Sequence, residues 1–158
     1  ADSEPMGGKV TLASVPKLPA EMESFFQFLE TEGIHYSFDK KRLLVQNGYV
    51  QYIPEGMPEL KGLHIMRSGW FLGELKKKRF EPSGAFARGL TPDVCDKVIA
   101  YPGDSEEVVR YLKCETLQVN PNLKNGWYLI CVDEFALGWG KVSNGTLKNK
   151  YPSGWRLV

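Results

Sequence analysis

The sequence has few of the residues that disulfide scaffolds and metal sites require. It contains three cysteines and two histidines among 158 residues. Cys95, Cys114 and Cys131 are an odd number without Cys-x-x-Cys spacing, so a disulfide framework is not expected. His35 and His64 are isolated, so a zinc site is not expected either. This use of cysteine is typical of a reducing compartment, and we expect a cytoplasmic protein.

Long apolar runs are also missing. No segment approaches the roughly 18 apolar residues that a membrane span needs, so a membrane partner is not expected. The composition, with 42% hydrophobic and 12% aromatic residues and a mean hydropathy of −0.30, is typical of a folded globular protein. The length fits one compact unit or two small subdomains packed together. The first residues, ADSEPMGG, lack a signal-peptide pattern and are typical of a linker at the start of a fragment.

Charge is strongly segregated along the chain, although the net charge is only +1. Residues 1–60 carry 5 basic and 9 acidic side chains, whereas residues 61–90 carry 7 and 2. Residues 91–134 carry 4 and 8, and residues 135–158 carry 4 basic side chains and none that is acidic. If the two basic blocks meet in the fold, they create a positive field that attracts a polyanion. The alternative is that each basic block pairs with an acidic one.

The chain is organised around its last segment, GWYLICVDEFALGWGKVSNGTLKNKYPSGWR, residues 126–156. Tyr128, Ile130 and Val132 alternate with their neighbours, which predicts a strand. Asn144-Gly145 is the strongest hairpin signal in the chain, because both residues tolerate the positive φ of a type I′ turn. The segment therefore predicts a small β-meander with a cationic rim, which is more typical of a binding surface than of an active site.

Two amphipathic helices are predicted upstream of this segment. In LPAEMESFFQFLETEG, four apolar side chains have helical spacing and Gly33 can end the helix. In GDSEEVVRYLKCETL, Asp104 is the expected N-cap and Glu107 completes a capping box. The expected inward-facing residues are Met22, Phe25, Phe26 and Leu29 in the first helix and Val108, Val109 and Leu112 in the second.

Short strands and one short helix fill the remaining segments. Asn47-Gly48 predicts a turn between two strands that end at Pro54, and Trp70 to Leu75 predicts a strand that leads into four consecutive cations. A short helix is expected after Pro82. Further strands are expected around Leu63 and Ile65 and in VIAYP, residues 98–102.

Three segments in this order resemble the C-terminal extension of the RsmF-type methyltransferases. They are MRSGWFLGELKKKRFEPS, EEVVRYLKCETL and the final segment from Gly126. The most specific part is LGWGKVSNGTLKNKYPSGWR, which carries Gly-Trp-Gly-Lys, Leu-Lys-Asn and Tyr-Pro-x-Gly in order. This family is a branch of the Sun enzymes that make 5-methylcytosine in small-subunit ribosomal RNA.

The resemblance implies an α+β protein built from a small α+β lobe and a PUA-like mixed β-barrel with short helices. It places a linker at residues 1–18, an intermediate lobe at 19–92 and a PUA-like RNA-binding domain at 93–158. It also implies two partners, small-subunit ribosomal RNA and an upstream methyltransferase domain. S-adenosylmethionine is expected in that upstream domain and no cofactor in this chain, which we expect to be a monomer.

The catalytic motifs of the family are not found in this sequence. Family members carry their catalytic cysteines in Pro-Cys and Thr-Cys motifs, whereas Cys95 follows Val, Cys114 follows Lys and Cys131 follows Ile. We therefore expect no methyl transfer by this chain alone, although the parent protein would be an rRNA (cytosine-5-)-methyltransferase. An enzymatic alternative would need a pocket that pairs Cys114 with acidic residues of the segment 104–107.

The candidate RNA-binding residues combine cations for phosphates with aromatic and amide groups for bases and sugars. Three alternatives stay open: Trp139 as a core residue, Asn149 as a turn-former, and the whole chain as a module that docks on the catalytic domain or the ribosome with little RNA contact. Trp155 is a further stacking candidate. The candidate residues are Lys76, Lys77, Lys78, Arg79, Trp139, Lys141, Lys148, Asn149, Lys150, Tyr151 and Arg156.

Overall fold

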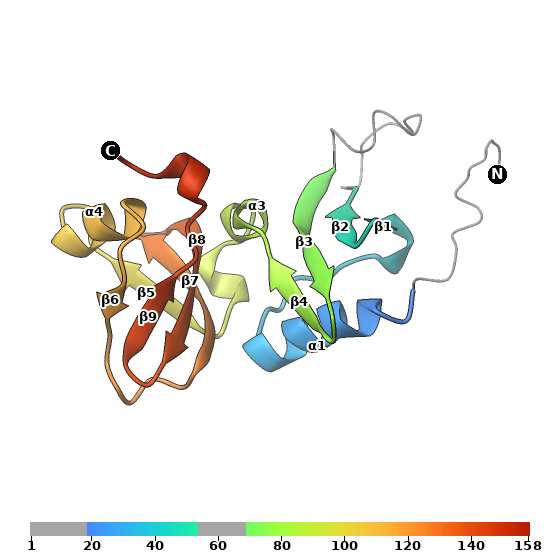
Figure 1. The fold of residues 1–158 in the computed structure, drawn as a ribbon, viewed down its shortest axis with the longest axis horizontal. Helices are drawn as coiled ribbons and strands as arrows, with labels where there is room; N and C mark the ends of the chain where they lie inside the picture. The colour runs from blue at the N-terminus through green and yellow to red at the C-terminus, as the bar shows by residue number, and fades with distance from the viewer. Residues whose placement is uncertain (1–18, 54–68) are drawn as a thin grey trace. The chain divides into compact units, whose positions relative to one another are not determined.

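The computed structural model describes residues 19–53 and 69–158, which form two compact units (Figure 1). Of the described residues, unit 1 comprises 19–26, 37–53 and 69–81, and unit 2 comprises Gln27–Tyr36 and Pro82–Val158. Helix α1, Met22–Glu32, contributes residues to both. The expected linker at 1–18 and the strand expected around Leu63 lie outside the described residues.

Unit 1 is built on a four-stranded sheet in the order β1-β2-β3-β4. Asn47 and Gly48 have φ angles of 53° and 83°, so the predicted two-residue turn between β1 and β2 is confirmed. Phe25 of α1 is fully buried, and its ring lies edge-on to those of Phe38 and Phe80, at 5.4 and 4.9 Å. The elements are η2, Lys40–Arg42; β1, Leu43–Gln46; β2, Tyr49–Tyr52; β3, Trp70–Lys76; and β4, Arg79–Pro82.

Unit 2 is built on a curled five-stranded sheet in the order β5-β7-β8-β9-β6, with short helices around it (Figure 1). Strands β5 and β7 are parallel, and the other neighbours are antiparallel. This mixed sheet agrees with the expected α+β class. The elements are α3, Gly84–Arg88; η3, Pro92–Val94; β5, Val98–Tyr101; α4, Glu106–Leu112; β6, Leu117–Gln118; β7, Gly126–Val132; β8, Phe135–Ser143; β9, Thr146–Asn149; and η4, Ser153–Trp155.

Both faces of the unit 2 sheet are covered along its middle. Tyr128 and Ile130 pack on one face with Tyr111 of α4, whereas Trp139 on the other face contacts Phe86 of α3. Because of this two-sided cover, every residue from 128 to 131 is buried, and the alternation read from the sequence is not repeated in the burial. The hairpin at Asn144-Gly145 is confirmed, with φ angles of 49° and 84°.

Helix α4 begins one residue later than the sequence predicts. Ser105, not Asp104, is the N-cap, because its hydroxyl oxygen accepts a hydrogen bond from the backbone N–H of Val108. This register buries Val108 and Tyr111, while Val109 is 43% exposed, so its expected inward orientation is wrong. In the part of the chain that the structure describes, no helix is long and apolar enough to cross a membrane.

Candidate nucleic-acid interface

One row of side chains crosses three neighbouring strands of unit 2. Trp127 on β7 is directly opposite Lys141 on β8, and Lys141 is directly opposite Lys148 on β9. Residues in direct register point to the same face of a sheet, so the three side chains share one face. Lys150 follows just after β9, and its Nζ lies 5.6 Å from the centre of the Trp127 ring. We call these four residues, Trp127, Lys141, Lys148 and Lys150, the Trp127 patch.

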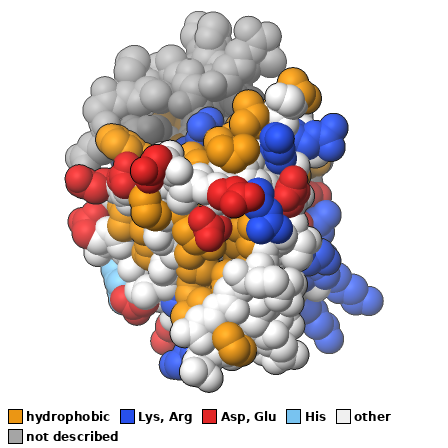
Figure 2. All heavy atoms as spheres, turned by 90° about the vertical axis from the view of Figure 1, so that its left-hand side faces the viewer, with side chains coloured by type: hydrophobic (Ala, Val, Ile, Leu, Met, Phe, Trp, Pro, Cys, Tyr) orange, Lys and Arg blue, Asp and Glu red, His pale blue; other side chains and the backbone are white. Residues whose placement is uncertain are grey.

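The three lysines of the Trp127 patch have no carboxylate within 4 Å among residues 19–53 and 69–158. Lys141 Nζ lies 5.5 Å from the ring centre of Trp127, which is a cation–π contact. Lys141 and Lys148 are exposed. On the face drawn in Figure 2, several Lys and Arg side chains lie along one edge, and others lie among Asp and Glu side chains nearer the middle. The patch therefore offers positive charge that an anion can reach.

Trp127 contacts a nearly buried ion pair through its backbone and two aromatic rings through its side chain. Its backbone N–H donates to Glu32 Oε1 at 2.9 Å, and the same oxygen accepts from Lys97 Nζ at 2.5 Å. The rings of Phe28 and Trp139 lie edge-on to the indole, with ring centres at 6.0 and 6.3 Å. The backbone hydrogen bond fixes the chain at Trp127, and the two ring contacts restrict the positions open to its indole. Sequence reasoning did not select Trp127, which lies opposite Lys141 in the observed register of the β7–β8 hairpin.

Trp139, a candidate for base stacking, belongs to the core. It is only 2% exposed, its Nε1–H donates to the Ser83 carbonyl at 2.8 Å, and the ring of Phe86 lies 5.6 Å away. Its ring has no open face because helix α3 packs against it. The alternative reading of Trp139 as a core residue is the one that the structure supports.

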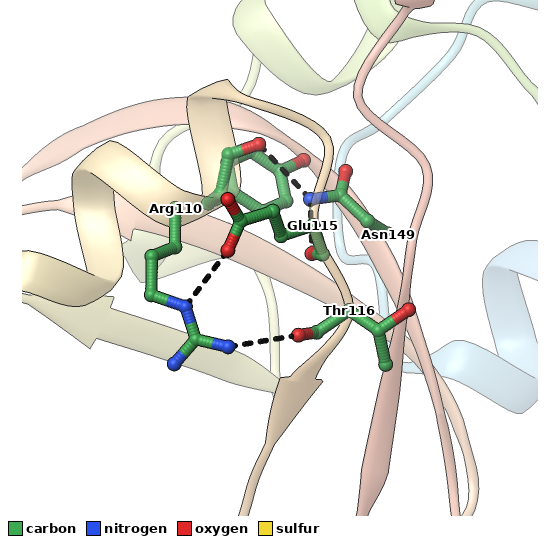
Figure 3. Close-up of polar contacts among 5 residues, drawn as sticks. Arg110, Glu115, Thr116 and Asn149 are labelled. Carbon is green, nitrogen blue, oxygen red and sulfur yellow. Dashed lines mark hydrogen bonds and ion pairs between the residues drawn. The ribbon is translucent and has the colours of Figure 1, made fainter.

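Asn149 ties strand β9 to the end of helix α4 (Figure 3). Its Nδ2 donates to the carbonyls of Tyr111 and Glu115 at 2.9 and 2.8 Å, and its Oδ1 accepts from the Tyr151 N–H at 2.8 Å. Arg110 lies beside this junction and contacts Glu115 at 3.0 Å. The amide is therefore engaged on both sides within the protein, which gives Asn149 a structural role, and its contact with a phosphate or sugar stays a prediction.

The residues that follow β9 form a smaller aromatic group. The half-buried ring of Tyr151 lies between those of Tyr111 and Trp155, at 5.3 and 5.7 Å. Trp155 is 41% exposed, and the Arg88 guanidinium carbon lies 4.8 Å from the centre of its ring. Arg156 is exposed. Tyr151 is therefore chiefly a packing residue, whereas Trp155 and Arg156 remain accessible.

The other basic cluster, residues 76–79, lies at the β3–β4 turn of unit 1. Lys76 pairs with Glu74 at 3.2 Å, and Arg79 pairs with Glu81 at 3.6 Å. Lys77 and Lys78 are exposed at the turn and make no ion pair within the described residues. The two flanking acids thus neutralise two of the four charges and leave the turn itself cationic.

Two family models match this chain. Residues 99–157 match the model described as the methyltransferase RsmF PUA domain, and residues 26–90 match the RsmF rRNA methyltransferase first C-terminal domain. This chain is the C-terminal region of an RsmF-type methyltransferase. The match confirms the resemblance seen in the sequence and the PUA-like fold class. A comparison with curated proteins returned no match.

Both matched models describe C-terminal domains of an RsmF-type enzyme, so this chain is an accessory part of an rRNA methyltransferase. Its cysteines are consistent with that role. Burial raises the pKa of the Cys131 thiol to about 11 and that of Cys95 to about 12, so neither is a thiolate near neutral pH. Cys114 Sγ donates to the Tyr151 carbonyl at 3.6 Å. Among the described residues, no group of three or more His, Cys, Asp or Glu could hold a metal ion.

Proposed function

We propose that this chain is an RNA-binding module that positions small-subunit ribosomal RNA for an upstream methyltransferase domain. That domain would bind S-adenosylmethionine and methylate carbon 5 of a cytosine, while this chain, as a monomer, would supply only RNA contacts. The observation that carries the proposal is the Trp127 patch, where three lysines lack carboxylate partners in the described part of the chain. Lys141 and Lys150 approach the Trp127 ring, and Lys148 lies directly opposite Lys141. The family descriptions, which name an rRNA methyltransferase, support RNA as the polyanion.

The two basic clusters have different roles in this proposal. The Trp127 patch contacts the RNA segment nearest the PUA domain through Lys141, Lys148 and Lys150. Lys77 and Lys78, at the β3–β4 turn, contact a second stretch of the same RNA, with Lys76 and Arg79 contributing less because each already faces a carboxylate. Arg156 extends the contacts of unit 2. Phosphate contacts of this kind fix the orientation of the RNA without reading its sequence.

The salt dependence of RNA binding tests the proposal. Each lysine–phosphate contact contributes about −0.7 to the slope of log K against log salt for a single strand. The three lysines of the Trp127 patch then contribute about −2, and Lys148→Gln should make the slope less steep by about 0.7. The matched control is Lys124→Gln, because it removes an exposed lysine of the same unit that lies outside the patch.

The rival function, docking on the catalytic domain or a ribosomal protein, predicts a different result. Binding through an apolar protein surface depends little on salt, and RNA would be retained only weakly. RNA affinity that does not change with salt, or that is equally affected by Lys148→Gln and Lys124→Gln, would favour this rival and refute the proposed function.

A further inference from the structure

Trp127 and Trp139 both contact Phe28 of helix α1, but Trp127 also has two cations near its ring, whereas Trp139 is covered by helix α3 as well. Lys141 and Lys150 approach the Trp127 ring within 5.5 and 5.6 Å of its centre, whereas Trp139 is covered by Phe86. Trp127 is half-buried, and the lysines that cover it are on flexible stems. Their ammonium groups can leave the ring when a better partner arrives.

A nucleobase is such a partner. Stacking of a base on an aromatic ring is worth more than a cation–π contact at an exposed site. A base that replaces an ammonium group over the indole brings a phosphate with it, and the displaced ammonium group can bind that phosphate. Both groups therefore gain a stronger contact in the exchange.

The positions open to the indole are also restricted before binding. The rings of Phe28 and Trp139 lie steeply inclined to the indole and close to it, and Glu32 accepts a hydrogen bond from the Trp127 backbone N–H, which fixes the backbone at this residue. Glu32 is itself fixed by its ion pair with Lys97, in which the two side chains are 12% and 17% exposed. A ring restricted in this way loses less conformational entropy on stacking than a free one, which favours affinity.

We propose that Trp127 is the stacking platform for one unpaired nucleotide of the RNA, with Lys141, Lys148 and Lys150 on the flanking phosphates. The inference rests on the proposed function and makes it more specific. Bases inside an RNA duplex are stacked on one another and present no free face, so only an unpaired segment can use the indole. The Trp127 patch should therefore prefer single-stranded or loop RNA to a duplex.

The test compares one RNA in two forms. The complete 158-residue chain is titrated with a short single-stranded RNA of mixed sequence and with the same strand annealed to its complement. Trp127→Leu keeps an apolar side chain but removes the stacking face. It should weaken binding of the single strand by at least about fivefold and binding of the duplex by less than about twofold. Phe135→Leu, at an aromatic residue that is 73% exposed at the start of β8, should change neither affinity.

A second measurement does not depend on how Trp127→Leu folds. In Trp155→Phe, which removes an exposed indole near the C-terminus, the single strand should quench tryptophan fluorescence and the duplex should not. Equal quenching by both RNAs, or an equal loss of both affinities in Trp127→Leu, overturns the inference.

Lys148→Gln separates the failure of this inference from a failure of the proposed function. If Lys148→Gln lowers the affinity for both RNAs, while Trp127→Leu affects the single strand and the duplex equally, only the inference about Trp127 is refuted. If Lys148→Gln changes neither affinity, the proposed function is refuted as well.

Discussion

The Glu32–Lys97 pair gives the sharpest stability prediction. The two side chains are 12% and 17% exposed, and Glu32 Oε1 accepts hydrogen bonds from both Lys97 Nζ and the Trp127 N–H. Glu32→Leu leaves the ammonium group without its carboxylate and the N–H without its acceptor. Breaking a fully buried pair from one side costs about 3–5 kcal/mol. Because this pair retains some solvent contact, we expect a loss of about 2–4 kcal/mol in the free energy of unfolding.

The contribution of each contact can be separated by three further variants. Glu32→Gln keeps an acceptor for the Trp127 N–H and should cost less than Glu32→Leu. Lys97→Met combined with Glu32→Leu removes both charges, so the double variant should be less destabilised than the sum of the single variants, by at least about 1 kcal/mol.

Urea unfolding followed by circular dichroism measures these differences. Glu115→Gln is the control, because its ion pair with Arg110 has both side chains more than 40% exposed, at 47% and 44%. An exposed pair contributes about 0–1 kcal/mol. Additive costs in the double variant, or a loss in Glu32→Leu no larger than that in Glu115→Gln, would refute the reasoning.

Three more predictions concern the interior of unit 2. Asn149→Ala removes three hydrogen bonds at the α4–β9 junction and should cost about 2–3 kcal/mol in urea unfolding, whereas Lys148→Ala on the same strand should cost less than about 0.5 kcal/mol. Trp139→Ala should cost about 3–5 kcal/mol, since it empties a buried site. Burial raises the pKa of Cys95 to about 12 and that of Cys131 to about 11, from 9.0. Because the folded state keeps these thiols protonated, their contribution to the free energy of unfolding is constant below pH 9 and is lost as the pH rises toward 11–12. A free energy of unfolding that falls between pH 6 and 8 in the unmodified protein, but not in Cys95→Ala, would contradict this.

The local signals in the sequence predicted much of the fold. Asn47-Gly48 and Asn144-Gly145 both form the expected turns, because two adjacent residues that tolerate positive φ define a tight hairpin without help from distant contacts. The first helix was also correct, since apolar residues at helical spacing predict an amphipathic helix. These features depend on neighbours in sequence, which a single chain displays directly. The buried face of the first helix was only partly correct, because Phe28 is buried with Met22 and Phe25, whereas Phe26 and Leu29 are half-buried.

Features that depend on distant contacts were less accessible. The burial of Trp139 follows from the packing of α3 and α1, and the role of Asn149 follows from the position of the α4 end. Neither packing partner can be read from the local pattern. Trp127 was not predicted, although it lies opposite Lys141 in the β7–β8 hairpin, because that hairpin has a register shift between Ile130 and Cys131 that a simple count from the turn does not give. Lys141 and Lys148, by contrast, lie directly opposite each other across the hairpin that Asn144-Gly145 predicts.

Mapping amide and indole NMR shifts during titration with an unpaired small-subunit RNA segment tests the central claim most directly. The account predicts that the largest changes occur at the Trp127 indole N–H and at the amides of Trp127, Lys141 and Lys148, and that they diminish at high salt. It also predicts little change at residues 133–135, at the other end of strands β7 and β8. Changes centred on residues 133–135 or on helix α4, with none at Trp127, would contradict it.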